Sequence, residues 1–458
     1  MMIMINFVIN SNIKNKKAII YTIYYLTKNF NCDIKVSYEK IEDALNIYYG
    51  INSNDGIYIP IDDKWGEMSF VKYRDDLFAT FNKDIKEPFS NVANKIQFNY
   101  DILFISKFLL TCEEEYKIKD RDDKNRFIAA LSLRNEKVNI PFFNINSFIL
   151  LEAINEFNKS IKFKDSNFEV FLTHDVDSVN SRNRYVFLHN LKSLLLNKEN
   201  CFKEKSKELI LDILYNRHLQ INKYMEIENK RHAKSEFYFI AGEKHRLGKR
   251  YDLMDIKNEI TNLKNSPNHI IGIHTNFFSY NNKEKIQNEI NEIEDKAGVI
   301  VKSCRNHYLR CNNPETLNIL SECRIISDST IGYSDINGFR AGICNGYVPY
   351  DLNKNECIDI WETPLIVMDG IVMEKSIPFN QKWQEIKNNI DYAIKYNGTV
   401  SVLFHQRVIL SEEYKKMYEK ILDYVVEKKG KFVTSLDFEE RKNNDLRKIN
   451  ELVSSINI

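Results

Sequence analysis

Two aspartates lie at the end of the apolar segment FEVFLTHDVD, residues 168–177. Side chains two apart on a strand face the same way, so Asp175 and Asp177 project together from its carboxyl end. In parallel α/β folds, active sites form at this end of the strands. Two carboxylates this close repel each other unless a cation or an arginine lies between them. The segment therefore indicates either a cation site or a polar loop in which one aspartate caps the next helix.

Three further apolar segments end in ionisable side chains. HIIGIHTNFFS contains His274, VIVKSCRNHYLR contains Arg305 and His307, and TVSVLFHQR contains His405. An arginine at a strand end can hold Asp175 ionised, and a histidine with a pKa near neutrality suits a general acid or base. Each residue alone could equally be a satisfied core histidine or a surface ion pair. Four strands with such groups at the same end predict one convergent site.

The elements that must position these residues alternate between strand and helix from residue 168 onward. Helices are predicted to begin at Pro314, where a missing N–H costs little, and at Ser411, a capping residue followed by acidic side chains. This alternation predicts an α/β domain with parallel strands, either a barrel or a doubly wound sheet. The predicted strands are residues 168–173, 236–241, 269–275, 299–305, 357–364, 399–405 and 431–436.

The chain is long enough for two domains. Residues 1–165 mix short strands with helices and predict a smaller α/β domain. Residues 166–440 predict the domain that carries the site, with a charged helical insertion at 184–231, and residues 441–458 predict a loose helical tail. Within the first domain, residues 101–116 have helical spacing of apolar side chains. The three glutamates at the end of that helix, Glu113 to Glu115, are expected to be solvated.

Composition excludes several classes of protein. Lys plus Arg (65) and Asp plus Glu (64) nearly cancel, which gives no basic surface for a nucleic-acid partner. The eight cysteines form no CxxC pair, which favours reduced thiols. The sequence MMIMINFVIN lacks the features of a signal peptide, and the apolar stretch at 18–26 is half the length of a membrane span. We therefore expect a cytoplasmic protein without a membrane span.

The motifs THDVD, GIHTNFFS, CRNHYLR and VLFHQR resemble those of the NodB-homology polysaccharide deacetylases, carbohydrate esterase family 4. The resemblance implies a distorted (β/α) barrel with one divalent metal ion, often zinc, with cobalt or manganese as alternatives. It implies that Asp175 is the catalytic base and that Asp177 and His274 bind the metal. It further implies that Arg305 orients the base and that His405 is the general acid.

The resemblance extends to a bacterial branch of deacetylases with an uncharacterised amino-terminal domain, through DSTIGYSDINGFRAG and WETPLIVMDG. Glu362 in the latter is assigned to the fourth motif of the family. One position departs from the pattern, because Phe278 stands where the second motif has a His or Ser, and phenylalanine cannot bind a metal. The candidates for the third ligand are, in order, His307, Ser279, and then His174 or His269, with water as a further alternative.

The function that the resemblance implies is removal of an N-acetyl or related acyl group from a carbohydrate, or from a nucleotide- or lipid-linked sugar, in the synthesis of bacterial surface polysaccharides. Two alternatives keep the same fold: an amidohydrolase on a non-sugar amide, and a degenerate, non-catalytic carbohydrate-binding or assembly protein. The oligomeric state is not determined by the sequence. The chain contains no GxSxG, HExxH or phosphate-binding glycine loop, which excludes the hydrolases that use them.

Overall fold

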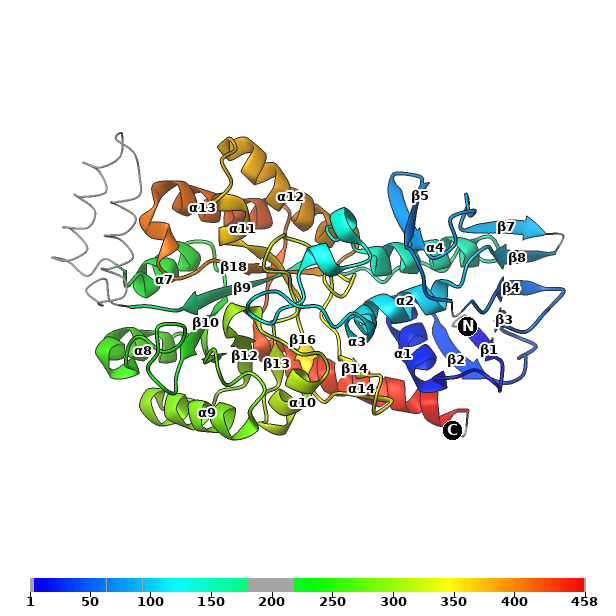
Figure 1. The fold of residues 1–458 in the computed structure, drawn as a ribbon. Helices are drawn as coiled ribbons and strands as arrows, with labels where there is room; N and C mark the ends of the chain where they lie inside the picture. The colour runs from blue at the N-terminus through cyan, green and yellow to red at the C-terminus, as the bar shows by residue number, and fades with distance from the viewer. Residues whose placement is uncertain (1–3, 63, 93, 180–217, 457–458) are drawn as a thin grey trace. The chain divides into compact units, whose positions relative to one another are not determined.

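The computed structural model describes residues 4–62, 64–92, 94–179 and 218–456. These residues form two units (Figure 1). The first unit contains Met1–Ser166, Ile331–Pro364 and Glu439–Ile458, and the second contains Asn167–Thr330 and Leu365–Phe438. The sequence pattern places 331–364 in the barrel domain, but this segment packs within the first unit, where the hydroxyl of Tyr21 donates to the carbonyl of Val348 at 2.8 Å.

The carboxyl-terminal residues are part of the first unit. They form helix α14 (Phe438–Ser454), where a loose helical tail was expected. The carboxylate of Asp445 on this helix accepts hydrogen bonds from the hydroxyls of Tyr24 and Tyr25 and pairs with Lys28, whose Nζ lies 2.6 Å from Oδ2. These contacts hold the helix against α1 (Lys16–Thr27).

The first unit is built on a mainly parallel sheet. Its strand order is β2-β1-β3-β4-β8-β7, in which only the last pair, β7 with β8, is antiparallel. A separate antiparallel hairpin joins β5 to β6. Helices α1, α2, α3 and α4 complete the fold, and the prediction of an α/β fold for this region agrees with this architecture. The bounds are β1 (Met4–Ile9), β2 (Asp33–Ser37), β3 (Leu45–Tyr49), β4 (Gly56–Ile59), β5 (Ser69–Tyr73), β6 (Asp76–Thr80), β7 (Phe89–Val92), β8 (Lys95–Phe98), α2 (Ile102–Leu110), α3 (Glu114–Lys117) and α4 (Phe142–Asn155).

The glutamates after α2 contradict the expectation of a solvated helix end. Glu114 and Glu115 are buried. Glu114 pairs with Arg134 at 3.1 Å, and Glu115 pairs with Arg340 at 2.7 Å. A buried carboxylate needs a hydrogen-bonded counter-charge, which Arg134 supplies from 20 residues away and Arg340 from 225 residues away. Glu113 is only partly buried and forms ion pairs with lysines.

The second unit is a parallel (β/α) sheet of barrel type, as predicted. The strand order of the sheet is β16-β13-β12-β11-β10-β9-β18-β17, with β19 also paired to β9 and with β16 formed by Trp361–Glu362. The pairings from β13 to β17 and the pairing of β19 are all parallel. Six of the seven predicted strands lie close to β9, β10, β11, β12, β18 and β19. The seventh, 357–364, contains β16 at the edge of the same sheet, although the segment 331–364 groups with the first unit. The bounds are β9 (Glu169–Val176), β10 (Ser235–Ile240), β11 (His269–Thr275), β12 (Ser303–Asn306), β13 (Ser327–Asp328), β17 (Leu365–Met368), β18 (Thr399–Leu403) and β19 (Lys431–Phe432).

Helices connect these strands and cover the sheet with apolar faces. Helix α9 (Lys283–Ala297) buries Ile286, Ile290 and Ile293, which are spaced to form one face. Asn282 caps its start, because its side chain accepts the N–H of Lys285 at 2.9 Å. The other main helices of this unit are α7 (Ile221–Asn229), α8 (Lys257–Lys264), α10 (Glu315–Glu322), α11 (Asp369–Met373), α12 (Phe379–Lys395) and α13 (Glu412–Glu427).

Two helix starts and the helical insertion are predicted from the sequence. Helices α10 and α13 begin directly after Pro314 and Ser411, as expected, although the side chain of Ser411 makes no capping hydrogen bond. Most of the predicted helical insertion, 184–217, lies outside the described residues. The described remainder of it contains helix α7.

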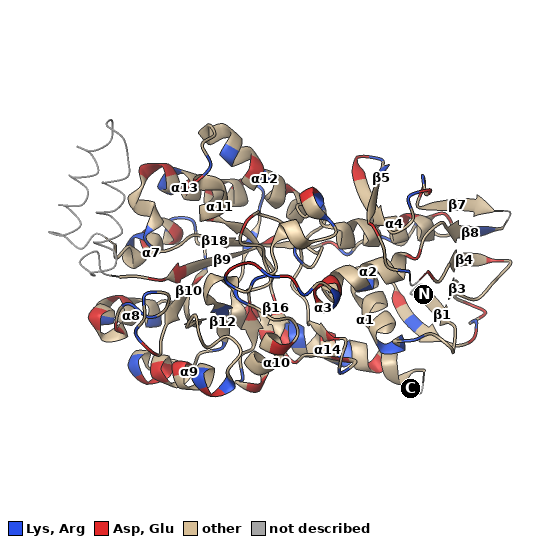
Figure 2. Ribbon diagram, viewed as in Figure 1, with Lys and Arg blue, Asp and Glu red and all other residues tan. Residues whose placement is uncertain are grey.

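The charged side chains are distributed as the near-neutral composition predicts. Figure 2 shows Lys and Arg interspersed with Asp and Glu along the helices of both units. Within the described ranges, no helix combines the length and the apolar character needed to cross a bilayer. The seven cysteines of the described residues are all free.

Candidate metal centre and active site

The carboxyl ends of three parallel strands of one sheet, β9, β11 and β12, bring the predicted residues together. Asp175 lies near the end of β9 and Asp177 directly follows it, while His274 lies near the end of β11. Arg305 lies on β12, opposite His274 in the parallel register. His307 directly follows β12. Since parallel strands end at one edge of the sheet, all five side chains share that edge.

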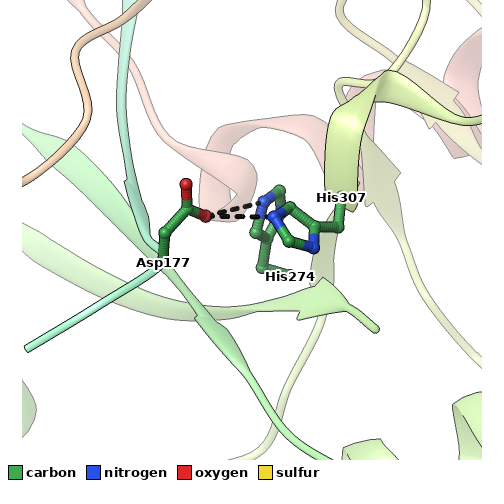
Figure 3. Close-up of side chains that lie close together, drawn as sticks. All are labelled: Asp177, His274 and His307. Carbon is green, nitrogen blue, oxygen red and sulfur yellow. Dashed lines mark ion pairs between the residues drawn. The ribbon is translucent and has the colours of Figure 1, made fainter. Parts of the chain in front are cut away.

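Asp177, His274 and His307 form a cluster that can hold a metal ion (Figure 3). The Oδ1 atom of Asp177 lies 3.5 Å from Nε2 of His274 and 3.4 Å from Nε2 of His307. One ligand atom from each residue lies within 4.8 Å of the others. The family resemblance implied Asp177 and His274 as metal ligands, and His307 was ranked first among the candidates for the third ligand.

The donor atoms fit a divalent metal. Oδ1 of Asp177 is buried and has no hydrogen-bond partner in the described structure, which is costly unless a cation binds there. Nδ1 of His274 lies 2.7 Å from the carbonyl oxygen of Arg305, which fixes the proton on Nδ1 and leaves the Nε2 lone pair for a metal. One carboxylate and two imidazoles are a common ligand set for zinc and also suit cobalt and manganese.

The other candidate histidines have structural roles. Nε2 of His174 lies 2.8 Å from Oε1 of Glu228, and Nε2 of His269 lies 3.0 Å from Oε2 of the same glutamate. All three side chains are fully buried. Glu228 therefore uses both oxygens on these imidazoles, and neither histidine is part of the Asp177 cluster.

Ser279 and Phe278 do not take part in the cluster either. The hydroxyl of Ser279 is buried and lies 3.1 Å from Oε2 of Glu289. The ring of Phe278 is 51% exposed and lies 4.9 Å from the ring of His245 in an edge-on arrangement. The position where the family's second motif has a His or Ser is thus not used, and His307 takes its place in the cluster.

Arg305 holds Asp175 beside this cluster. Its Nη1 lies 3.2 Å from Oδ1 of Asp175, and the same nitrogen donates to the hydroxyl of Thr173 at 2.7 Å. The guanidinium also donates to the backbone carbonyl and the hydroxyl of Ser329 at 2.8 and 2.9 Å, and its carbon lies 5.1 Å from the ring centroid of Tyr238. This fully buried arginine is fixed from several sides, so it can stabilise the ionised form of Asp175.

His405 approaches the cluster from β18. Its Nε2 lies 3.9 Å from Oδ2 of Asp177. Its Nδ1 lies 2.9 Å from Oδ1 of Asp369, and its backbone N–H donates to Oδ2 of the same carboxylate at 2.8 Å. Asp369 is buried and binds His405 through both oxygens, so it orients the imidazole with Nε2 toward the cluster.

Asp369 is the site residue that the sequence reasoning missed. It begins α11, immediately after β17, and thus lies at a strand end like the other site residues. The predicted strand 357–364 stops at Pro364. β17 begins at the next residue, Leu365, and ends at Met368, so its end was not predicted. Glu362, assigned to the fourth motif instead, lies on β16 (Trp361–Glu362) of the first unit, where it accepts the N–H of Ile331 at 3.0 Å.

The electrostatics of the cluster suit metal binding. Burial alone raises the pKa of Asp177, but the neighbouring His307, His274 and His405 hold it well below the usual range. Burial lowers the pKa of His307 to about 3, and the opposing effect of Asp177 does not offset this. At neutral pH the cluster thus offers an ionised carboxylate and a neutral His307, the protonation states that a metal requires.

The pKa of His405 is shifted in the opposite direction to that of His307. Burial lowers its pKa, but the adjacent carboxylates, first Asp369 and then Asp177 and Asp175, outweigh burial and raise it to about 10. The pKa of His274 is also raised, since Asp175 and Asp177 outweigh the effect of burial. In the protein without a metal, His405 therefore carries a proton at neutral pH and can donate it.

The turn that carries His307 is strained. Tyr308 and Leu309, which follow it, have φ angles of 61° and 56°. Such left-handed conformations are costly for non-glycine residues, and they concentrate at functional sites. The strain is needed to turn the chain immediately after β12, and it places the His307 ring 4.8 Å from the ring of His274.

Comparison with known proteins gives structural resemblances only. No protein-family model and no curated protein sequence matches the chain. Solved structures that match include polysaccharide and peptidoglycan deacetylases and a pseudoenzyme of carbohydrate esterase family 4.

Three of these structures serve as examples. A polysaccharide deacetylase structure from Mycobacterium smegmatis has 12% identity and a TM-score of 0.42, and the match covers 63% of this chain and 93% of that one. The catalytic domain of a peptidoglycan N-acetylglucosamine deacetylase from Eubacterium rectale has 12% identity and a TM-score of 0.31, over 59% and 91%. The pseudoenzyme, from Bacillus anthracis, has 11% identity and a TM-score of 0.33, over 60% and 66%. Since these scores lie below 0.5, the function proposed next rests on the residues of this chain.

Proposed function

We propose that the chain is a metal-dependent deacetylase that hydrolyses an N-acetyl or related acyl group on a carbohydrate or a carbohydrate precursor. The observation that carries the proposal is the arrangement at one sheet edge. An incomplete ligand set, Asp177 with two histidines, lies between a carboxylate fixed by Arg305 and an imidazole fixed by Asp369. This arrangement supplies a cation site, a base and an acid, the three groups that amide hydrolysis needs.

Asp175 acts as the general base. The guanidinium of Arg305 orients this carboxylate, and Asp175 accepts a proton from the water that attacks the acyl carbon. A divalent metal held by Asp177, His274 and His307 would supply Lewis acidity, which makes water more acidic and polarises the acyl oxygen. A proton that is already on His405 is then available for the leaving group.

His405 acts as the general acid. Its Nδ1 is bound by Asp369, which leaves the Nε2–H toward the site, and Nε2 protonates the sugar nitrogen as the carbon–nitrogen bond breaks. The products are acetate and a free amine, and the proton taken up by Asp175 balances the one released by His405. Asp369 is a positioning residue, since it contacts only His405 in this scheme.

The substrate class follows from the motifs THDVD, CRNHYLR and VLFHQR, which resemble those of deacetylases that act on carbohydrates. We place the reaction in the synthesis of a bacterial surface polysaccharide, in the cytoplasm. The cluster at Asp177 does not depend on Phe278, so the departure from the motif at that position gives no support to a degenerate site.

The test combines metal content with acetate release. The full chain is purified without chelator, supplied with zinc, cobalt or manganese, and assayed on N-acetylated oligosaccharides and uridine diphosphate N-acetylglucosamine. Asp175→Asn should abolish turnover and keep the metal, whereas His274→Ala should lose both. His232→Asn, on an exposed histidine outside the cluster, is the matched control and should keep both.

Two outcomes would contradict the proposal. Full turnover in Asp175→Asn would remove its role as base. The absence of a stoichiometric metal in the wild-type chain, after supply of each of the three ions, would favour the non-catalytic carbohydrate-binding alternative. Turnover of cyclic ureides in place of acetylated sugars would favour the non-sugar amidohydrolase.

A further inference from the structure

The parallel sheet of the first unit has a topological switch point at β1. This strand pairs in parallel with β2 on one side and with β3 on the other. The chain passes from β1 through α1 to β2, and then returns to the opposite side of β1 to form β3. In open α/β sheets, ligands bind in the crevice outside the carboxyl ends of the strands at such a point.

A cavity of about 440 Å³ lies at this switch point. Asn10, which follows β1, Tyr49, which ends β3, and Ile61, which follows β4, all line it. These residues mark the carboxyl ends of three parallel strands. The volume lies in the range of sites for small organic molecules, roughly 300–1,000 Å³.

The charges along this cavity favour an anion. Lys14, Lys107 and Lys117 line it, and Glu113 is the single acidic residue among the described residues that do so. The carboxylate of Glu113 lies between two of the lysines, with Oε2 at 2.7 Å from Nζ of Lys107 and Oε1 at 3.5 Å from Nζ of Lys117. The lining therefore carries two positive charges in excess. A structural ion pair would need only Lys107, which is buried.

The start of helix α1 adds to this positive potential. The residues before it, Asn12 to Asn15, line the same cavity, and Asn15 makes no side-chain capping bond. The amino end of a helix carries partial positive charge and favours anions. The loop contains no glycine, so a phosphate would be held mainly by lysine ammonium groups and not by a close glycine-rich backbone.

Part of the remaining lining is apolar, and the cavity is larger than a phosphate alone would fill. Ile13, Ile19, Ile61 and the ring of Phe104 contribute it. A ligand that fills the cavity must thus combine anionic groups with a flat or apolar part. From this combination we propose that the first unit binds a nucleoside diphosphate, with its phosphates on Lys14 and Lys117 and its base against the apolar side. This inference does not depend on the proposed hydrolase activity.

The test is isothermal titration of the full chain with uridine diphosphate, adenosine diphosphate and inorganic pyrophosphate as probes. We expect saturable one-to-one binding of a nucleoside diphosphate with Kd below about 1 mM. The double variant Lys14→Glu with Lys117→Glu should weaken it by about tenfold or more, because two charges are reversed. Both side chains are largely solvent-accessible, and circular dichroism checks that the fold is retained.

Two control variants test whether the binding is specific to this cavity. Lys72→Glu reverses an exposed lysine on β5 of the same unit, away from the cavity lining, and should leave the Kd unchanged. Asp177→Ala removes a candidate metal ligand in the other unit and should also leave it unchanged. Equal weakening by Lys72→Glu, loss of binding in Asp177→Ala, or no saturable binding of either nucleotide would overturn the proposal. Pyrophosphate binding as tight as that of both nucleotides would overturn the nucleoside part.

Discussion

Glu115 in the first unit and Asp177 in the second are both acids surrounded by nitrogen atoms, but their surroundings differ in completeness. Both oxygens of Glu115 accept hydrogen bonds from Arg340, at 2.8 and 2.7 Å. Oδ1 of Asp177 is buried, faces two imidazole nitrogens at 3.4 and 3.5 Å, and has no hydrogen-bond partner in the described structure. A satisfied ion pair supports the fold, whereas an unsatisfied buried oxygen among metal-binding side chains suits the binding of a cation.

Glu289 shows a third way to accommodate a buried carboxylate. It accepts the N–H of Asn276 at 2.9 Å and lies near Ser279, but burial dominates and raises its pKa to about 7. Protonation neutralises the buried carboxyl of Glu289, as the arginine neutralises Glu115 and a metal would neutralise Asp177. Glu115, Asp177 and Glu289 thus differ in what offsets their buried charge, and each case predicts a different response to mutation, pH and metal.

The largest effect is expected from breaking the satisfied pair. Arg340→Ala should lower the free energy of unfolding by about 3–5 kcal/mol, because it leaves Glu115 buried without a counter-charge. Urea denaturation followed by fluorescence measures this. The double variant Glu115→Leu with Arg340→Met should recover most of the loss, since apolar replacements can be neutral. Asp123→Ala, in an exposed pair with Lys124, should cost under about 1 kcal/mol. A loss of the same size in Asp123→Ala and Arg340→Ala would contradict the comparison.

The next effect concerns Glu289 and pH. Its pKa in the folded protein is above the unfolded value, so the folded state holds the proton more tightly and its stability falls as pH rises from about 4.5 to about 7. Between pH 4.5 and 8 the wild type should lose roughly 3 kcal/mol more than Glu289→Gln, which does not titrate. Urea denaturation of both proteins at the two pH values tests this. The contributions of all other titratable groups to the free energy of unfolding cancel in the difference between the two proteins. A parallel pH dependence of the two proteins would refute the assignment.

Metal binding should stabilise the second unit by a comparable amount. Zinc at about 100 times its Kd should add roughly 2.7 kcal/mol to the wild type, and a chelator should remove this gain. His274→Ala should show no gain, since its imidazole is the one fixed by a backbone carbonyl. Thermal unfolding with and without zinc is the measurement, and His232→Asn is the control that should respond like the wild type. An equal gain in His274→Ala would place the metal elsewhere.

The smallest effect is expected at Phe278. Since His307 takes the third position in the cluster and Phe278 is half exposed, Phe278→His should change zinc affinity by less than about threefold, or roughly 0.7 kcal/mol. A competition titration with a chromogenic chelator measures the affinity. An increase of tenfold or more would show that the cluster lacks a ligand without a histidine at position 278.

The strand-end reasoning selected most of the residues that the structure brings together in the candidate site, because this reasoning depends on local sequence pattern. β9, β11 and β18 are short apolar segments with β-branched residues, and polar groups follow directly, so both strand and end are visible in the sequence. Asp369 was missed because no strand was predicted at Leu365–Met368, which forms β17 directly after the predicted strand 357–364. Its neighbours Met368 and Gly370 give no signal of a strand end.

Other features could not be predicted from local sequence. Glu115 meets Arg340, which is 225 positions away, so nothing near the glutamate indicates that it is buried. The left-handed conformations of Tyr308 and Leu309, which help to place His307, are set by tertiary packing and not by residue type. The sequence could therefore only rank the candidates for the third ligand. In the structure, His174 and His269 contact Glu228, and Ser279 contacts Glu289, so none of these three lies in the cluster.

The first unit is discontinuous along the chain, and this has a consequence for how the protein is made. Its sheet comes from the earliest residues, but Ile331–Pro364 and helix α14 are translated only after most of the second unit. During translation, hundreds of residues are synthesised after the sheet before Asp445 is available to contact Tyr24 and Lys28. We therefore expect the nascent amino-terminal segment to need chaperone protection, and a fragment cut near residue 166 to aggregate when expressed alone.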